Sequence, residues 1–241
     1  MTKALKELAD QYNELFASLS PQQILQRVVE VHSAKAVFST SLGVEDQAIT
    51  HILMQISRDV SIFTLDTGRM FPETYEVLEK TEARYGIRIK VVFPDYKAVE
   101  HMVQTRGINL FYYSIENRKM CCHIRKIEPL KRALKNQEVW ITGLRREQSP
   151  TRQDLHYAQL DEENQVIKVN PLLDWSDQQV WNFVRDNDIP FNTLHQKGFP
   201  SIGCQPCTRA IEPGEDLRAG RWWWENPETK ECGLHKRGKH D

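Results

Sequence analysis

The stretch Ala36-Val37-Phe38-Ser39-Thr40-Ser41-Leu42-Gly43 decides the fold, because a short apolar run ends abruptly in small and hydroxyl-bearing residues. A helical stretch is expected next, from Glu45 to Ile56. The same order returns at Val60–Leu65, which ends in Asp66-Thr67-Gly68 before a helix expected over 72–85. Short strands separated by helices are typical of a parallel sheet covered on both faces. We therefore expect an α/β fold with a mostly parallel, twisted sheet and helices on both faces.

Further elements extend this pattern in both directions along the chain. Residues 1–32 are expected to form helices, the second beginning at Ser20-Pro21. Additional strands are expected at Ile87–Phe93 and at Glu138–Thr142. From Gly198 onward the sequence loses its periodicity, which is typical of an ordered loop followed by a tail. We expect one α/β domain over 1–213, with its helical N-terminus, and a mobile C-terminal tail over 214–241.

The overall composition excludes several classes of protein. The 241 residues include 32 Lys and Arg against 33 Asp and Glu, a net charge of −1, which argues against a general nucleic-acid or membrane-surface binder. No uncharged run approaches the ~18 residues that a membrane span needs. The N-terminus lacks the apolar core of a signal peptide. We therefore expect a soluble cytoplasmic protein without nucleic-acid or membrane partners, whose five cysteines are reduced.

The charge is nevertheless unevenly distributed. Residues 118–152 contain ten Lys and Arg but only three acidic residues, a local excess of +7. Such a run is typical of a solvated helix face, but it also suits a pocket for a small, strongly anionic ligand.

Ligand-binding residues are expected where strands end. In parallel α/β sheets, ligands bind outside the carboxyl ends of the strands, and Ser39–Gly43, Asp66–Gly68 and Gly143–Arg146 fall there. The segment Ser39–Asp46 leads into a helix, so its backbone N–H groups could hold a phosphate. It contains neither a Walker loop nor a dinucleotide fingerprint. A plain strand-to-helix turn is the alternative.

The cysteines form two pairs and a single residue. Cys121 and Cys122 are adjacent, Cys204 and Cys207 enclose two residues, and Cys232 is the tenth residue counted back from the end of the chain. Four thiolates in two pairs can hold an iron–sulfur cluster or zinc. Adjacent cysteines fit a single zinc ion poorly. A redox CxxC beside an incidental pair, or buried structural cysteines, remain alternatives.

Cys232 stands in Glu231-Cys232-Gly233-Leu234-His235. The glycine leaves the thiol accessible, and the basic residues after it favour the nucleophilic thiolate. An unused surface thiol is the alternative. The run Trp222-Trp223-Trp224 precedes this segment and could be either a docking anchor for the tail or a buried apolar patch.

These residues resemble the assimilatory adenylyl-sulfate (APS) reductases. The resemblance rests on ordered motifs covering about residues 36–235: Ser39-x-Ser41-x-Gly43, Leu65-Asp66-Thr67-Gly68, Cys121-Cys122-x-x-Arg125-Lys126, Gly143-Leu144-Arg145-Arg146-Glu147-Gln148-Ser149, Gly203-Cys204-x-x-Cys207, Arg218-x-x-x-Trp222 and Glu231-Cys232-Gly233-Leu234-His235. Related phosphoadenylyl-sulfate (PAPS) reductases share the tail motif but generally lack the paired cysteines. The wider PP-loop superfamily reads Ser-Gly-Gly-x-Asp-Ser where this chain has Ser41-Leu42-Gly43-Val44-Glu45-Asp46. That departure disfavours ATP cleavage.

The resemblance implies a fold, a reaction and a set of roles. The fold is the PP-loop, adenine-nucleotide alpha-hydrolase-like type. The reaction reduces APS to sulfite and AMP in assimilatory sulfate reduction and cysteine biosynthesis, through an S-sulfocysteine at Cys232 that thioredoxin resolves by a transient mixed disulfide. One [4Fe–4S] cluster per chain is implied on Cys121, Cys122, Cys204 and Cys207. Catalytic roles fall to Cys232, His235 and Lys126, and substrate binding to Ser39, Ser41, Leu42, Gly43, Leu65, Asp66, Thr67, Gly68, Gly143, Arg145, Arg146, Arg218 and Arg221.

Three other functions fit parts of the sequence. A PAPS or dual-specificity reductase would differ in its tolerance of a 3′-phosphate. A PP-loop RNA sulfurtransferase would need ATP, and a non-catalytic iron–sulfur or zinc nucleotide sensor would leave Cys232 unexplained. The sequence does not decide between a monomer and a homo-oligomer.

Overall fold

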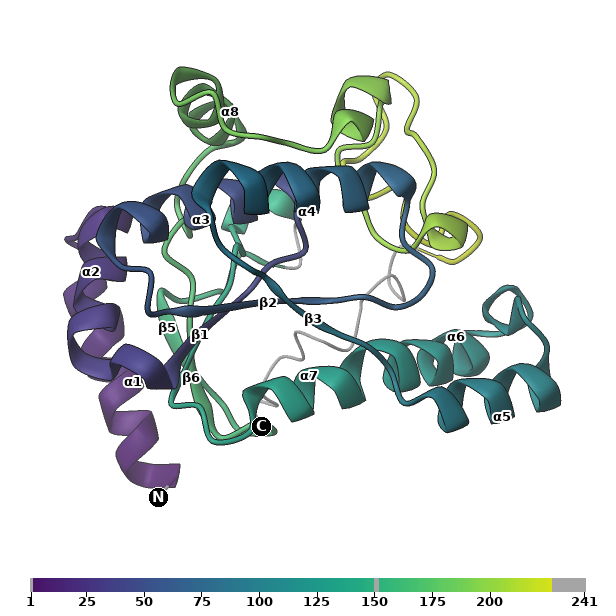
Figure 1. Cartoon of the computed structure of the whole chain (residues 1–241), viewed down its shortest axis with the longest axis horizontal. Coiled ribbons are helices and arrows are strands. Elements are labelled where there is room, and N and C mark those ends of the chain that lie inside the picture. Colours follow the sequence, from purple (N-terminus) through teal and green to yellow (C-terminus); the bar gives the residue numbers. More distant parts are fainter. Residues whose placement is uncertain (1, 150–151, 227–241) are drawn as a thin grey trace. The chain divides into compact units, whose positions relative to one another are not determined.

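Helices and strands alternate along most of the chain in the structure, a computed structural model that describes residues 2–149 and 152–226 (Figure 1). The helices are α1 (Thr2–Phe16), α2 (Pro21–His32), α3 (Val44–Ile56), α4 (Pro72–Tyr85), α5 (Tyr96–Arg106), α6 (Ile115–Cys122), α7 (Glu128–Leu134) and α8 (Asp177–Asp186). The strands are β1 (Ala36–Ser39), β2 (Ser61–Leu65), β3 (Lys90–Val92), β4 (Val139–Ile141), β5 (Ala158–Asp161) and β6 (Val166–Val169). Within the described ranges, no helix combines the length and apolar character needed to cross a membrane.

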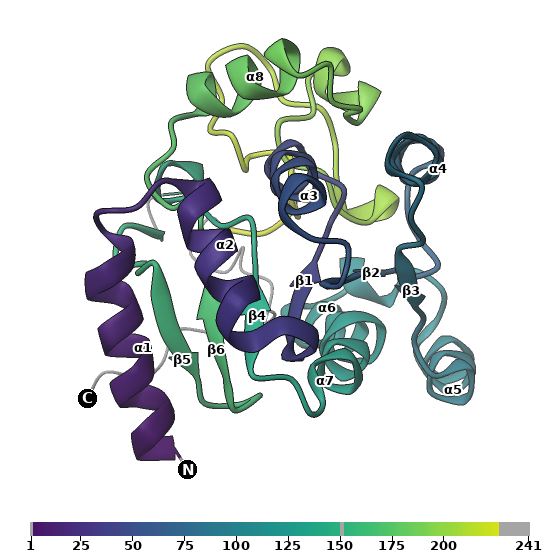
Figure 2. The same ribbon diagram turned by 60° about the vertical axis from the view of Figure 1, so that its left-hand side comes forward.

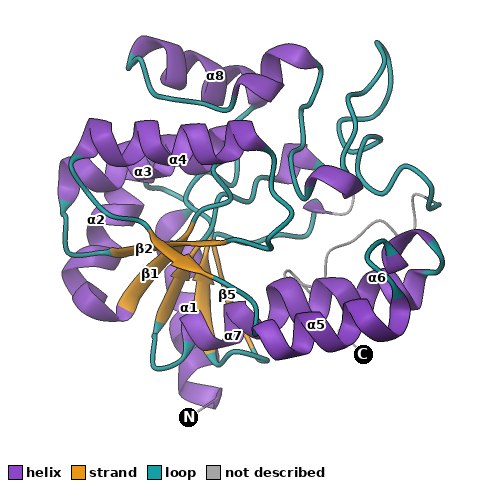
Figure 3. Ribbon diagram, turned by 45° about the vertical axis from the view of Figure 1, so that its right-hand side comes forward, coloured by secondary structure: helices purple, strands orange, loops and turns teal. Residues whose placement is uncertain are grey.

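The strands of the described residues form a six-stranded sheet in the order β3-β2-β1-β4-β6-β5 (Figure 3). Strand β1 is parallel to both of its neighbours, and Phe38 lies in register with Ile62 of β2 and Ile141 of β4. Strand β6 is parallel to β4, whereas β5 pairs with β6 in the antiparallel direction. The predicted α/β class with a mostly parallel sheet is therefore confirmed.

Most elements expected from the sequence are present. The strand predicted over 36–39 and the helix predicted over 72–85 have the predicted bounds. The strand predicted over 87–93 is wrong in its length, since only Lys90–Val92 is extended. The backbone N–H groups of Ile87 and Ile89 instead bond to Glu82, at its carbonyl and its carboxylate. Strands β5 and β6 were not predicted.

The contacts within the chain define two compact units. The first contains the described residues of 1–64, 76–90 and 134–192, and the second contains those of 65–75, 91–133 and 193–241. Both units are assembled from separated segments, and neither follows the predicted boundary at residue 213. A separate tail over 214–241 stays a prediction, because residues 227–241 lie outside the described residues.

The first unit has its core around β1 and the N-terminal helices. Helix α1 packs on β5 and β6 (Figure 2), and α2 packs on β1 and α3. Phe16, Leu25 and Phe38 are fully buried in one apolar cluster. The predicted start of α2 is confirmed, since Ser20 and Gln23 form a capping box with Pro21 in the first turn. This packing holds the carboxyl end of β1 and the start of α3 in place.

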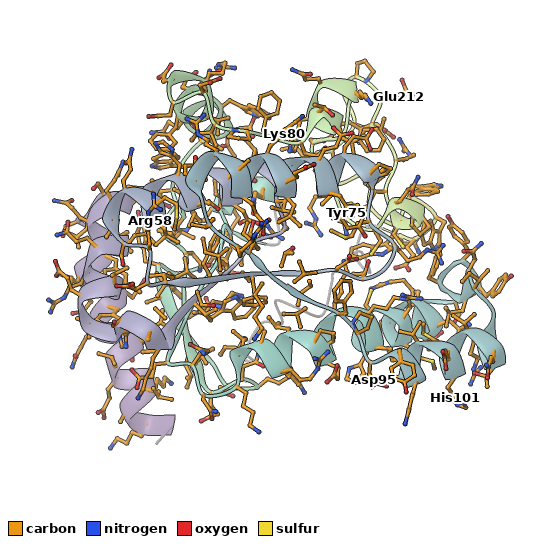
Figure 4. All side chains as sticks on the ribbon, viewed as in Figure 1. Arg58, Tyr75, Lys80, Asp95, His101 and Glu212 are labelled. Atoms are coloured by element: carbon orange, nitrogen blue, oxygen red, sulfur yellow. The ribbon has the colours of Figure 1, made fainter. Side chains whose placement is uncertain are left out.

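The second unit has a smaller core that includes the cysteines. Helix α5 begins where Asp95 accepts a hydrogen bond from the Ala98 backbone, and Figure 4 labels Asp95 at this end of the helix. Met102 of α5 is buried with Cys122, Cys207 and Trp222 in one cluster. The core of this unit therefore surrounds residues that the sequence marks as ligands.

Candidate functional site

The four paired cysteines line a single cavity within the second unit. The space not filled by atoms is about 390 Å³. Cys121 and Cys122 end helix α6, while Cys204 is the N-cap of the short helix η7 (Gln205–Cys207) and Cys207 is its last residue. All four are free thiols. The other lining residues are Arg69, Phe111, Arg118, Arg125, Lys126, Pro206, Arg221 and Trp222.

A π-helical turn orients the first cysteine pair. Helix α6 continues after Cys122 into the π-helix His123–Ile127, which leads directly into α7. π-helical turns are rare in proteins overall, and those that occur often lie at functional sites. This one carries Arg125 and Lys126, so the two cations line the same cavity as the cysteines just before them.

Hydrogen bonds fix the second pair. The Cys204 carbonyl accepts from the Cys207 backbone N–H at 2.9 Å and from the Thr208 hydroxyl at 3.0 Å. The Tyr112 hydroxyl donates to the Pro206 carbonyl at 2.6 Å. The Thr67 hydroxyl oxygen lies 3.2 Å from the Cys204 sulfur. These contacts within the second unit therefore shape the loop that carries Cys204 and Cys207.

Burial disfavours the charged form of these thiols. The pKa of the Cys207 thiol is raised from 9.0 to about 12, chiefly by burial and to a smaller degree by nearby Cys204, while Lys126 and Arg221 oppose the shift. Burial also raises the pKa of Cys121, against the favourable charge of Arg125. Stable thiolates at this site would therefore need a bound positive centre, which is what metal coordination provides.

Two buried N–H groups on the cavity wall strengthen the case for a bound group. The side-chain Nε of Arg221 and Nε1 of Trp222 are buried without a hydrogen-bond partner among the described residues. Arg221 is 8% exposed, and a Cβ at Gly203 would lie 2.3 Å from its Nη2 atom. Glycine at 203 thus permits the close approach of Arg221. Orphaned donors beside four thiols fit an anionic thiolate-bound group.

The site does not have the geometry of a single metal ion. Among the described residues, no group of three or more His, Cys, Asp or Glu side chains is arranged to hold one ion. Four thiols that line one cavity in two pairs instead suit a group that binds several thiolates at once. Four cysteine thiols are the donor set that an iron–sulfur cluster uses, so the residues present fit the predicted cluster.

The predicted segment Leu65–Gly68 also belongs to the second unit. Asp66 accepts hydrogen bonds from the Gly68 backbone at 2.7 Å and from the Tyr75 hydroxyl at 2.9 Å, and Figure 4 labels Tyr75. Gly68 has a φ of +70°, which favours glycine. The Thr67 carbonyl accepts from Arg125 at 2.6 Å. The segment is thereby joined to the helix that carries Cys121 and Cys122.

In the first unit, the loop after β1 is held by an internal carboxylate. Both the backbone N–H and the hydroxyl of Ser41 donate to Oδ2 of Asp46, each at 2.6 Å. Leu42 adopts a left-handed φ of +62°, and its N–H bonds to the Thr40 hydroxyl. Gly43 is the N-cap of α3. The predicted strand-to-helix turn is present. Asp46 accepts the hydrogen bonds from both the backbone N–H and the hydroxyl of Ser41.

Gly143 gives Asp46 the room it needs. A Cβ at position 143 would lie 2.2 Å from Oδ1 of Asp46. Burial raises the pKa of Asp46 from 3.8 to about 7, although the hydrogen bonds from Ser41 act in the opposite direction. Ser39 completes this end of the sheet by accepting a hydrogen bond from Trp140 at 2.7 Å. Sequence reasoning proposed Ser39, Ser41 and Gly143 but missed Asp46.

Arg145 and Arg146 have internal partners. Arg145 is 2% exposed and pairs with Glu45 at 2.8 Å and with Glu147 and Asp177 at 3.2 Å. Arg146 pairs with Asp174 and donates to the Leu155 carbonyl. In this structure their charges are compensated within the protein. Their predicted contact with substrate would require these ion pairs to open.

The local basic excess is divided between two kinds of position. Arg118 and Arg125 are buried and line the cysteine cavity with Lys126, whereas Lys119, Lys131 and Lys135 are exposed. The solvated-face interpretation therefore holds for the exposed residues, and an anionic ligand beside the buried ones stays a prediction. Arg118 is not among the residues predicted for the site. Its position three residues before Cys121 is the sequence feature that could have identified it.

The tail residues are only partly described. Trp222 is buried and Trp223 is 38% exposed, so neither interpretation of the tryptophan run covers both residues. Arg221 lines the cysteine cavity, and the Arg218 backbone bonds to Asp216. The predicted catalytic residues Cys232 and His235 lie outside the described residues.

Comparison with known proteins decides the family. The model of the "Phosphoadenosine phosphosulfate reductase domain" matches residues 35–210, well over half of the chain. The chain belongs to this family. Residues 35–210 include β1 and all four cavity cysteines, so the reductase domain covers the principal features of both units. The predicted oxidoreductase class is thereby confirmed.

Individual relatives are similar in sequence to this reductase over most of its length. It is 54% identical over 201 residues to the adenosine 5'-phosphosulfate reductase of Allochromatium vinosum, covering 83% of this chain and 78% of that one. It is 47% identical over 234 residues to the enzyme of the same name from Sinorhizobium fredii, covering 97% of this chain and 93% of that one. The resemblance to APS reductases inferred from the motifs is confirmed.

Solved structures agree on the fold. The phosphoadenylyl-sulfate reductase of Candida auris, a phosphate complex, has a TM-score of 0.73 and 27% identity, covering 86% of this chain and 97% of that one. The NH3-dependent NAD synthetase of Campylobacter jejuni has a TM-score of 0.50 and 12% identity, covering 78% and 77% of the two chains. The second likeness concerns the fold alone.

Proposed function

We propose that this reductase converts APS to sulfite and AMP with a thioredoxin-like dithiol protein as electron donor. It would act in assimilatory sulfate reduction and supply sulfite for cysteine biosynthesis in the cytoplasm. The observation that carries the proposal is the cavity lined by Cys121, Cys122, Cys204 and Cys207. The printed names of the relatives support APS as substrate.

The cavity is proposed to hold one [4Fe–4S] cluster through these four thiolates. Support comes from their common cavity, from the raised thiol pKa values and from Nε1 of Trp222, which has no hydrogen-bond partner within residues 2–149 and 152–226. When bound, the cluster would supply fixed charge beside Lys126, because the dithiol donor already delivers both electrons. Removal of either cysteine pair should therefore abolish incorporation of iron.

Nucleotide binding is proposed for the ends of strands in both units. In the first unit, Ser39, Ser41, Leu42, Gly43 and Gly143 lie where β1 and β4 end. The start of α3 adds backbone N–H groups and the positive end of the helix dipole. In the second unit, Leu65–Gly68, Lys126, Arg218 and Arg221 are proposed to bind substrate. Positive side chains are needed because anionic substrate and thiolate repel each other.

The proposed chemistry uses the tail cysteine. The Cys232 thiolate attacks the sulfur of APS, the bond from sulfur to the phosphate oxygen breaks, and AMP leaves with that electron pair. The product on the protein is S-sulfocysteine, and His235 is proposed to assist at Cys232. A donor thiolate then attacks the Cys232 sulfur and releases sulfite. The second donor thiol resolves the mixed disulfide, so the dithiol is oxidised by two electrons.

A PAPS or dual-specificity reductase is the second candidate, since the matching family model carries the PAPS name. The two substrates differ by a 3′-phosphate, so recognition of that group separates the candidates. The relatives at 47–54% identity are named for APS, which favours the first candidate.

A single turnover tests the proposed intermediate. Anaerobically purified protein is mixed with one equivalent of APS without a dithiol donor, and the protein is then digested for mass spectrometry. We expect one SO3 group on the peptide containing Cys232 and one equivalent of AMP. The Cys232→Ser variant should bind APS and retain its visible absorbance but form no adduct. AMP release by that variant at the wild-type rate would contradict the proposed nucleophile.

A further inference from the structure

The last described part of the chain is fixed to the cysteine cavity by a buried ion pair. Arg118 of α6 donates to both carboxylate oxygens of Glu225, from Nε at 2.9 Å and from Nη2 at 2.8 Å. The side chains are 1% and 3% exposed. Paired parallel hydrogen bonds between guanidinium and carboxylate are the most directional form of this interaction. The pair joins positions 107 residues apart in the sequence.

Trp222 reinforces the same connection. The guanidinium groups of Arg118 and Arg221 each lie 4.8 Å from the centroid of its ring. The Trp222 backbone N–H donates to the Cys207 carbonyl at 3.1 Å, and its carbonyl accepts from Glu225 at 2.8 Å. Arg118 thus contacts both ends of the turn Trp222–Glu225 while lying three residues before Cys121.

This connection limits how far Cys232 can travel. Cys232 lies seven positions after Glu225 in the sequence. A fully extended chain spans at most ~3.6 Å per residue, so Cys232 stays within roughly 25 Å of Glu225. A short tether raises the effective concentration of the group it carries at a nearby site. Loss of the fixed end would lower that concentration.

We propose that Arg118 and Glu225 are positioning residues that hold the base of the segment carrying Cys232. This inference rests on the proposed function, because it assumes that Cys232 is the nucleophile. It assigns no contact with substrate to either residue. Their effect is on how often the Cys232 thiolate reaches the sulfur of APS, and therefore on the rate of adduct formation rather than on APS binding.

The same unit contains a matched control. Arg209 pairs with Glu215 through two hydrogen bonds of 2.8 Å, with side chains 35% and 32% exposed. Glu215 precedes the turn Trp222–Glu225 and does not fix the chain after it. Glu215→Gln therefore removes a comparable bidentate pair without changing the tether.

The test compares Glu225→Gln, Glu225→Asp and Glu215→Gln with wild type in the single-turnover assay. Iron content, visible absorbance and equilibrium binding of APS are measured on the same samples. For Glu225→Gln we expect adduct formation at least about tenfold slower, with iron content and APS affinity within about twofold of wild type. Glu225→Asp keeps the charge and should recover part of the rate, and Glu215→Gln should match wild type.

Several results would overturn the inference. An adduct rate for Glu225→Gln equal to that of Glu215→Gln would show that the pair does not position the tail. Loss of iron or APS affinity in proportion to rate would show a purely structural role in the cavity. If Glu225→Gln does not fold, the Arg118→Lys variant undergoes the same comparison and the same outcomes decide. Failure of the wild-type protein to form any Cys232 adduct would instead reject the proposed function.

Discussion

Asp46 accepts both the backbone N–H and the hydroxyl of Ser41 at 2.6 Å, so one buried carboxylate shapes the loop between β1 and α3. A carboxylate at this place satisfies donors that a phosphate-binding loop would turn toward its ligand. Glu45, the preceding residue, forms an ion pair with Arg145 at 2.8 Å. The loop is thus organised by the protein's own acidic residues.

The pH dependence of stability should reveal this carboxylate. The folded pKa of Asp46, about 7, lies above its ordinary value of 3.8, so the folded state binds the proton more tightly than the unfolded state. The stabilising contribution is complete below pH 4 and is lost as pH rises through 7. Between these two pKa values, the contribution of Asp46 to the free energy of unfolding falls by up to ~1.4 kcal/mol per pH unit. Asp46→Asn should therefore gain stability relative to wild type as pH rises from 5.5 to about 8.

Urea unfolding of both proteins across that pH range measures the effect. The difference in unfolding free energy between variant and wild type isolates Asp46, since all other titrating groups are shared. Parallel stability curves would show that Asp46 has an ordinary pKa in the folded protein.

Gly143→Ala should destabilise the first unit. The added Cβ would lie 2.2 Å from Oδ1 of Asp46 and must displace the carboxylate that holds Ser41. We expect a loss of about 1–3 kcal/mol in the free energy of unfolding. Gly43→Ala is the control, because the nearest atom to its Cβ, Oγ of Ser41, is 3.3 Å away. Equal losses in the two variants would refute the steric explanation.

The metal-free protein should show an unreactive Cys207. Burial raises the pKa of its thiol to about 12, so the thiolate fraction at pH 8 is far below that of an ordinary cysteine. In protein stripped of metal and kept reduced, iodoacetamide should modify Cys207 at least about 100-fold more slowly than a free thiol. Quantitative mass spectrometry of the alkylated peptides measures the rate. A rate equal to that of free cysteine would mean that the pocket does not stay closed without metal.

Local sequence patterns predicted the features that depend on neighbouring residues. The apolar run at β1 followed by small residues, and the capping residues of α2, act over a few positions, so their structures could be predicted. Strand β6 could not, because it includes Lys168, which is 2% exposed and lies over the Trp140 ring at 5.0 Å. A charged residue in a strand normally indicates an exposed position.

The other features that could not be predicted depend on contacts between residues that are distant in the sequence. The ion pair of Arg118 with Glu225, and the raised pKa of Asp46, follow from burial between segments distant in the chain. Arg145, which the family resemblance places at the substrate, forms ion pairs with three acidic residues in this structure, and its substrate contact stays a prediction. Motifs therefore indicated which residues gather, but not which charges remain available.

The most direct test of the proposed function is sulfite release from APS and from PAPS by anaerobically purified protein with reduced thioredoxin. We predict rapid sulfite release from APS, with kcat/KM for PAPS at least about 100-fold lower. When thioredoxin is omitted, no sulfite should form from either nucleotide, because the donor thiolate is what releases sulfite from Cys232. Equal or faster turnover of PAPS, or absence of sulfite from APS, would contradict the account.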